Sequence, residues 1–132
     1  MKIWKQGVLF YMGGLTYFCL ELGWRRRSHG SMFLLGGLCF LLLGRLKWPK
    51  APLPRAILGA ALVTVLELGC GLLVNRNFQV WDYRRMPMNF RGQICLPFTA
   101  LWILLSLVAF PLYRCLDTAI EKATSLFPHR DV

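Results

Sequence analysis

Apolar residues occupy four long stretches of the chain, and short segments rich in basic residues, glycine or proline separate them. The stretches cover residues 7–24, 31–46, 56–74 and 92–113. A helix needs about 20 predominantly apolar residues to cross the hydrocarbon core of a bilayer, and four runs near this length argue against one water-soluble core. The pattern therefore predicts an all-α fold, an integral membrane four-helix bundle that forms one domain over residues 1–132.

The segments around these stretches refine the prediction. Three consecutive arginines at 25–27 end the first span, because guanidinium groups are costly in hydrocarbon. The second span is only about 24 Å long at ~1.5 Å per residue, so it requires local thinning or shielding of the bilayer. The link 45–55 holds three prolines and is expected to be non-helical. Pro97 and Pro111 are expected to bound or kink the fourth span, and the tail 114–132 predicts an interfacial amphipathic helix.

Composition and charge agree with a membrane location. The chain is 56% apolar, its mean hydropathy is +0.47 and its formal net charge is +10. The basic residues cluster at the ends of the apolar stretches, which is typical of membrane spans and argues against nucleic acid as a partner. Nine of the sixteen lysines and arginines fall on the side of the termini and seven on the other. This small bias predicts a multi-pass protein of the cell membrane with cytoplasmic termini, and it leaves insertion in both orientations open.

An internal similarity relates the two halves of the chain. Residues 13–23 and 59–69 are identical at five of eleven positions, and the identical positions include Glu21 and Glu67. Each segment belongs to a span that is followed by an arginine-bearing link and a second span. The similarity predicts two repeated helical hairpins related by an axis along the membrane normal. The alternative is chance, since leucine and glycine dominate every span.

Glu67 and Glu21 are the main candidates for a binding site. Glu67 lies well inside its span, where a carboxylate is costly unless it is paired or hydrated, so it is a candidate for function as well as for helix packing. Glu21 lies nearer the end of its span, with Arg25 four residues later, a spacing that suits a surface ion pair. If the halves pack symmetrically, both acids and the arginines of the two links, including Arg76, frame one polar cavity.

The segment 75–98 carries the least generic sequence in the chain. Its polar residues Asp82, Tyr83, Asn89 and Gln93 precede the last span, and its aromatic residues suit a membrane interface. Two interpretations remain open. The segment either caps the last helix at the level of the headgroups, or forms a re-entrant or gating loop over the cavity.

The sequence lacks the motifs that are typical of ATPases and hydrolases. The chain has no phosphate-binding loop of the G-x-x-x-x-G-K-[ST] type and no hydrolase motif, so we expect no enzymatic activity, with a lipid-acting enzyme as a weaker alternative. The five cysteines lie within or beside apolar runs and form no C-x-x-C pair. They are expected to act as small apolar residues, and we expect neither a metal nor a cofactor.

One motif resembles a known family. The pattern WDY-x-x-x-P-x-N-x-x-G-Q-I-C-L ends at Leu96 and resembles the bacterial membrane proteins described as Putative ABC-transporter type IV, or CmpB-like. The matching residues are Trp81, Asp82, Tyr83, Pro87, Asn89, Gly92, Gln93, Ile94, Cys95 and Leu96. The spans that carry Glu21 and Glu67 are similar to family helices that carry a glutamate. Residues 27–37 depart from the Asn-Arg-Gly and Gly-Pro-rich stretch of many relatives.

The resemblance implies a permease, and with it a partner membrane or ATPase subunit. We therefore expect a small permease-like component of a transporter, embedded in the lipid bilayer, whose polar cavity is completed by a homo-oligomer or by a partner. The alternative is a non-transporting membrane subunit or scaffold that binds a partner protein or anionic lipid.

Overall fold

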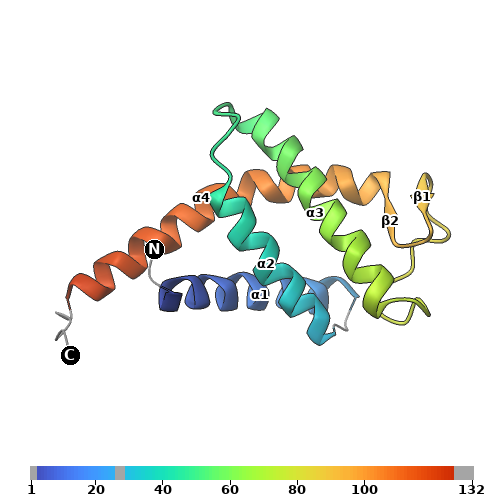
Figure 1. Cartoon of the computed structure of the whole chain (residues 1–132), viewed down its shortest axis with the longest axis horizontal. Helices are drawn as coiled ribbons and strands as arrows, with labels where there is room; N and C mark the ends of the chain where they lie inside the picture. The colour runs from blue at the N-terminus through green and yellow to red at the C-terminus, as the bar shows by residue number, and fades with distance from the viewer. Residues whose placement is uncertain (1–2, 26–28, 127–132) are drawn as a thin grey trace.

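The computed structural model describes residues 3–25 and 29–126, and this part is helical apart from its links and one short hairpin. The elements in chain order are α1 (Ile3–Arg25), α2 (Gly30–Arg45), α3 (Pro52–Val74), β1 (Asn89–Phe90), β2 (Ile94–Cys95) and α4 (Leu96–Ser125). The prediction of an all-α fold with four helices is confirmed. Successive helices run in opposite directions, and α2 and α3 lie obliquely to α1 and α4 (Figure 1).

The first two helices approach each other closely because glycines occupy their contact. A Cβ atom on Gly14 of α1 would lie 2.5 Å from the carbonyl oxygen of Phe33, and one on Gly37 of α2 would lie 2.7 Å from that of Phe10. Both distances are well below van der Waals contact, so only glycine allows this spacing. Small residues that bring helix backbones together are common where helices pack in membranes.

Helix α3 begins at Pro52, four residues before the predicted start at residue 56. The prediction was wrong because it treated the prolines as helix breakers. Pro52 and Pro54 occupy the first turn, where backbone N–H groups have no partner inside the helix, so proline removes no hydrogen bond there. The first helical bond follows at once, from Arg55 N to Ala51 O at 3.2 Å.

Helix α4 begins later than predicted and includes most of the predicted tail helix. It begins at Leu96 instead of residue 92, because residues 89–95 form the antiparallel hairpin of β1 and β2. It then continues through Pro111 to Ser125, so the predicted tail helix is a continuation of α4. Figure 1 shows α4 changing direction in its middle part, as expected for a helix with an internal proline.

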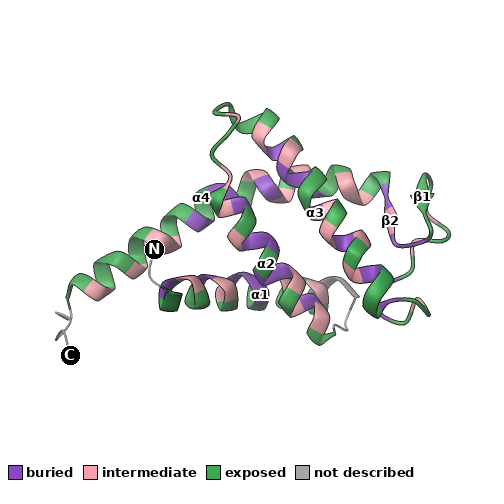
Figure 2. Cartoon of the chain, in the orientation of Figure 1, coloured by how far each residue is buried: buried purple, intermediate pink, exposed green. Residues whose placement is uncertain are grey.

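The buried residues face the inside of the helical assembly, and large apolar side chains cover much of its outside (Figure 2). The main core lies between α2, α3 and α4 and contains Leu43, Ala60, Val63, Trp102 and Phe110. Among the described helices, α3 and α4 are long and apolar enough to cross a membrane. Helix α2 is apolar but has 16 residues, and α1 falls short of the same apolar content.

Candidate functional site

Glu67 is buried on the inner face of α3, with 4% of its surface exposed. Its Oε2 accepts a hydrogen bond of 3.4 Å from the hydroxyl of Tyr83. Its Oε1 has no hydrogen-bond partner within the described residues. A buried carboxyl oxygen without a partner is costly, so this atom is a candidate contact for water or for a ligand.

Glu21 lies across a small cavity from Glu67. The cavity has a volume of about 40 Å³, and its lining includes Glu21, Glu67, Tyr17, Trp81 and Tyr83. The hydroxyl of Tyr17, one helical turn before Glu21 on α1, donates to Glu21 Oε1 at 3.1 Å. The structure thus brings together the two acids that occupy equivalent positions in the sequence similarity, each with a tyrosine donor. The repeat itself remains a prediction.

A second, larger cavity also has Glu67 in its lining. Its volume is about 130 Å³, and residues of all four helices line it. Besides Glu67, its lining includes Trp102 and Ser106, both from α4. Trp102 Nε1 and Ser106 Oγ are buried and make no hydrogen bond within the described part of the chain. Ser106 Oγ and Glu67 Oε1 therefore adjoin an otherwise mainly apolar cavity without a hydrogen bond to any described residue, and Trp102 lies beside the Glu67 carboxyl group.

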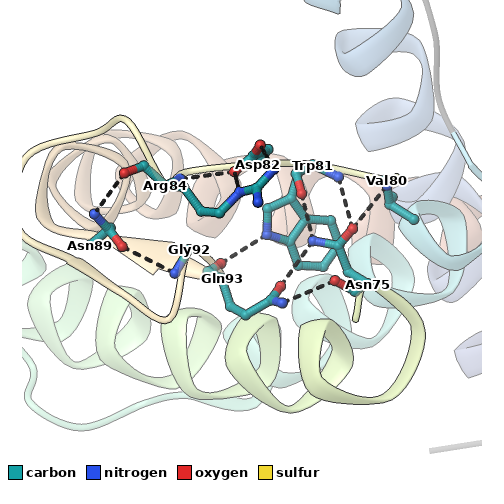
Figure 3. A network of polar contacts seen from close by, with 8 residues as sticks. All are labelled: Asn75, Val80, Trp81, Asp82, Arg84, Asn89, Gly92 and Gln93. Atoms are coloured by element: carbon teal, nitrogen blue, oxygen red, sulfur yellow. Dashed lines mark hydrogen bonds and ion pairs between the residues drawn. The ribbon is translucent and has the colours of Figure 1, made fainter. Parts of the chain in front are cut away.

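The loop 75–95 folds back on the end of α3 through a buried amide network (Figure 3). Asn75 is 1% exposed, and its Nδ2 donates to Trp81 O at 2.7 Å and to Gln93 Oε1 at 2.9 Å. Its Oδ1 accepts from the backbone nitrogens of Val80 and Trp81, at 2.9 and 3.1 Å. One side chain at the end of α3 thus holds both arms of the loop.

Gln93 completes this network from the opposite arm of the loop. Its side-chain Nε2 donates to the backbone oxygen of Asn75 at 3.0 Å, and its backbone carbonyl oxygen accepts from Trp81 Nε1 at 2.8 Å. Gly71 on α3 provides the space, because a Cβ there would lie 3.0 Å from Trp81 Cζ2 and closer still to Gln93 Oε1. Gln93 therefore positions the loop and lines neither cavity, whereas Trp81 and Tyr83 reach the smaller one. Tyr83 also stacks on Phe98 of α4, with ring centroids 4.8 Å apart.

Asp82 and Asn89 lie at the exposed outer part of the loop. Arg84 binds Asp82 through two charge-assisted hydrogen bonds, from Nε to Oδ1 at 2.9 Å and from Nη2 to Oδ2 at 2.8 Å. This guanidinium lowers the pKa of Asp82 to about 2. Asn89 Nδ2 donates to Met86 O at 2.9 Å, and its Oδ1 accepts from Gly92 N at 3.1 Å. Both residues shape the hairpin, and neither lines the cavities.

The arginines do not frame the cavities in the described part of the chain. Arg76 is exposed and its Nε donates to Leu72 O at 2.9 Å, which satisfies a carbonyl near the end of α3. Arg25 is the last residue of α1, and its side chain lies outside the described residues. No basic residue lines either cavity among the residues that the structure describes, so their charged groups are acidic. The same residues contain no group of three His, Cys, Asp or Glu placed to hold a metal.

Sequence reasoning missed Tyr17, Asn75, Trp102 and Ser106. A signal existed for Tyr17, since it precedes Glu21 by four residues and therefore lies on the same helix face. Trp102 and Ser106 show the same spacing on α4, but nothing in the sequence indicates that they face Glu67. Asn75 looks like an ordinary residue at the end of a helix until the loop is seen to close on it.

Comparison with known proteins identifies one family. The family model described as Putative ABC-transporter type IV matches residues 8–130. It is the family that the motif in the loop 75–95 resembles. No curated protein and no solved structure matches the chain.

Proposed function

The chain belongs to the family Putative ABC-transporter type IV, and on this premise we propose that it is a permease-like membrane component of a transporter. In this proposal all four helices cross the cell membrane, and the cavities beside Glu67 form the site that binds the transported molecule. The observation that carries the proposal is the buried carboxyl group of Glu67, which faces a cavity shared with Glu21 and has one oxygen without a partner in the described chain. ATP hydrolysis would be supplied by a partner subunit.

The distribution of side chains supports the four-span arrangement. Large apolar residues face outward on the helices, for example Val65 on α3 and Leu104 on α4, which are 67% and 61% exposed. Polar groups such as Glu67 and Ser106 face inward. This arrangement suits a lipid environment, because lipid chains replace water around the outer surface. The start of α1 and the end of α4 lie toward the same side of the molecule, as an even number of crossings requires (Figure 1).

The topology can be tested with two single cysteines. Lys50 and Gln79 are exposed in the links before and after α3, so the variants Lys50→Cys and Gln79→Cys place thiols on opposite sides of the membrane in this proposal. A membrane-impermeant maleimide applied to intact cells should label one position, and permeabilised cells should label both. The unsubstituted chain gives the background from the native cysteines. In intact cells, partial labelling of both positions would indicate that the protein inserts in two orientations. Complete labelling of both positions in intact cells would overturn the four-span arrangement.

The role of Glu67 can be tested by comparing cells that express matched variants. Glu67→Gln keeps the size of the side chain and one acceptor oxygen, replaces the other oxygen with an NH2 donor group, and removes the negative charge. Asp82→Asn makes the same chemical change at an exposed loop position. We expect untargeted mass spectrometry to show that wild type and Asp82→Asn change the cellular level of the same small molecule. Glu67→Gln should lose this effect at an equal amount of protein in the membrane, and an effect that it fully retains would overturn the proposal.

A second candidate function rests on the exposed basic residues of the loop 75–95. Arg85 and Arg91 are exposed, and their positive charge suits a partner protein or anionic lipid headgroups. In this alternative the chain is a non-transporting subunit or scaffold. Loss of partner or lipid binding in an Arg85→Ala, Arg91→Ala double variant, together with an unaffected Glu67→Gln variant, would favour the scaffold over the transporter.

A further inference from the structure

The larger cavity beside Glu67 combines an apolar wall with polar atoms that make no hydrogen bond to any described residue. Glu67 Oε1 and Ser106 Oγ are both buried, on residues that are 4% and 1% exposed. Neither oxygen makes a hydrogen bond within the described residues. Both can accept a hydrogen bond, so a ligand that donates hydrogen bonds would satisfy what the chain leaves unsatisfied.

The charges around the cavities favour a cation over an anion. The carboxylic acids that line them are Glu67 and Glu21, and the other titratable groups that face them are tyrosine hydroxyls and the Cys39 thiol. None of these groups carries a positive charge in any protonation state, and no described basic side chain lines either cavity. In the larger cavity an anionic ligand would face the Glu67 carboxyl group, and no described basic side chain lines this cavity, whereas an ammonium group would pair with that carboxyl group.

Aromatic rings strengthen the case for an ammonium group. Tyr17 and Trp102 line the larger cavity together with Glu67, and their ring centroids lie 5.8 Å apart with the planes tilted by 34°. Trp102 also lies beside the Glu67 carboxyl group. Aromatic faces attract cations, and the combination of such faces with a carboxylate is suited to recognise an amine.

The volume and the position of the opening indicate the apolar part of the ligand. An engineered protein cavity of about 150 Å³ holds benzene, and this cavity measures about 130 Å³. Its lining includes exposed residues of two helices, Thr16 and Leu20 on α1 and Val108 and Leu112 on α4. The cavity therefore opens between α1 and α4, toward lipid in the four-span arrangement.

We propose that this cavity binds a small apolar amine, with the ammonium group at Glu67 and Ser106, beside the rings of Tyr17 and Trp102, and an apolar group of about the size of a benzene ring against the apolar wall of the cavity. The inference rests on the proposed function, because it names the class of molecule that the transporter would bind. Access is lateral, between α1 and α4. Binding transfers no proton between ligand and protein when the amine enters charged and meets an ionised carboxylate.

Three probes with one ring and different charges test the proposal on the purified full-length protein in lipid nanodiscs. The probes are benzylamine, benzyl alcohol and benzoate, which are cationic, neutral and anionic at neutral pH. Saturation-transfer NMR of the ring protons reports binding without a label. We expect benzylamine to bind, benzyl alcohol to bind at least tenfold more weakly, and benzoate not to bind. Equal binding of benzylamine and benzoate by the wild-type protein would overturn the proposal.

Two matched variants locate the site. Glu67→Gln should weaken benzylamine binding at least tenfold, while Asp82→Asn should leave it within about threefold, because Asp82 is exposed on the loop and lines neither cavity. Equal effects of the two variants would overturn the assignment of the ammonium group to Glu67. If Glu67→Gln does not fold, the probe series on the wild-type protein still decides the ligand class.

The outcomes also separate this inference from the proposed function. A cellular effect that depends on Glu67, without any binding of benzylamine, would remove the ligand class and leave the transporter proposal standing. Benzylamine binding that depends on Glu67, without any cellular effect of Glu67→Gln, would support the amine site and contradict its role in transport.

Discussion

The variant Asn75→Ala should release the loop 75–95 from the end of α3. The substitution removes the four hydrogen bonds that the Asn75 side chain makes with Val80, Trp81 and Gln93. A hydrogen bond in a protein contributes a net ~1 kcal/mol to stability, so the loss is about 4 kcal/mol in the free energy of opening the loop. Since ~1.4 kcal/mol corresponds to a factor of ten, the open fraction should rise about a thousandfold.

Alkylation of Cys95 measures this opening directly. Cys95 is a free thiol at the end of the loop and is only 2% exposed, so it should react mainly when the loop opens. Pulse alkylation followed by peptide mass spectrometry gives the rate at this one cysteine. Asn77→Ala is the matched control, because Asn77 is exposed in the same loop. A Cys95 rate in Asn75→Ala within twofold of the Asn77→Ala rate would refute the role of the network.

Three further predictions concern the packing and the charges. Gly71→Ala should lower the free energy of unfolding by about 1–3 kcal/mol, because the added Cβ would meet Gln93 and Trp81. The control Gly69→Ala should not destabilise the protein, since no described atom lies within 4 Å of the Cβ added there. Equal unfolding curves of the two variants would contradict the prediction. Lys5 Nζ lies 2.7 Å from Asp117 Oδ1 and 2.6 Å from Glu121 Oε1, so it ties the start of α1 to the end of α4. Lys5→Met should therefore speed amide hydrogen exchange in the last three turns of α4. The control Lys122→Met should leave this exchange unchanged. Arg84→Ala should move the NMR titration midpoint of the Asp82 carboxyl group from about 2 toward its ordinary value. The Asp82–Arg84 pair lowers the folded-state pKa, so its stabilising effect is present above about pH 4 and disappears as the pH falls toward 2.

The helices could be predicted well from the sequence because each one contains a continuous apolar run. The starts of α3 and α4 were predicted wrongly, the first because of the prolines before it and the second because of the loop before it. A proline breaks a helix when it lies in the interior, but it is favourable in the first turn. Pro52 and Pro54 lie in the first turn of α3. The sequence alone does not show where the helix starts, so it does not distinguish the two cases. The start of α4 was placed too early because residues 92–95 directly precede the apolar run and were joined to it, although they form part of the turn and the second strand of a β-hairpin.

The candidate site was predictable only in part. Glu67 and Glu21 stand out because charged residues are rare in apolar runs. Tyr83, which donates to Glu67, lies sixteen residues after it, and Ser106 lies on another helix, so no local spacing relates these two residues to Glu67. Gln93 appeared as a candidate binding residue, whereas the structure shows it bonded to Asn75 and Trp81. The cavities themselves depend on how four helices cross, which a single sequence does not specify.

The most direct test of the central claim is the reaction of Glu67 with two carbodiimides of different polarity in native membranes. The claim is that Glu67 is buried and faces a cavity that opens toward the apolar side, between α1 and α4. Dicyclohexylcarbodiimide, which partitions into the bilayer, should modify Glu67. A water-soluble carbodiimide should modify the exposed Glu121, which is the internal control, and leave Glu67 unreacted. Peptide mass spectrometry that finds Glu67 as reactive as Glu121 toward the water-soluble reagent would contradict the account.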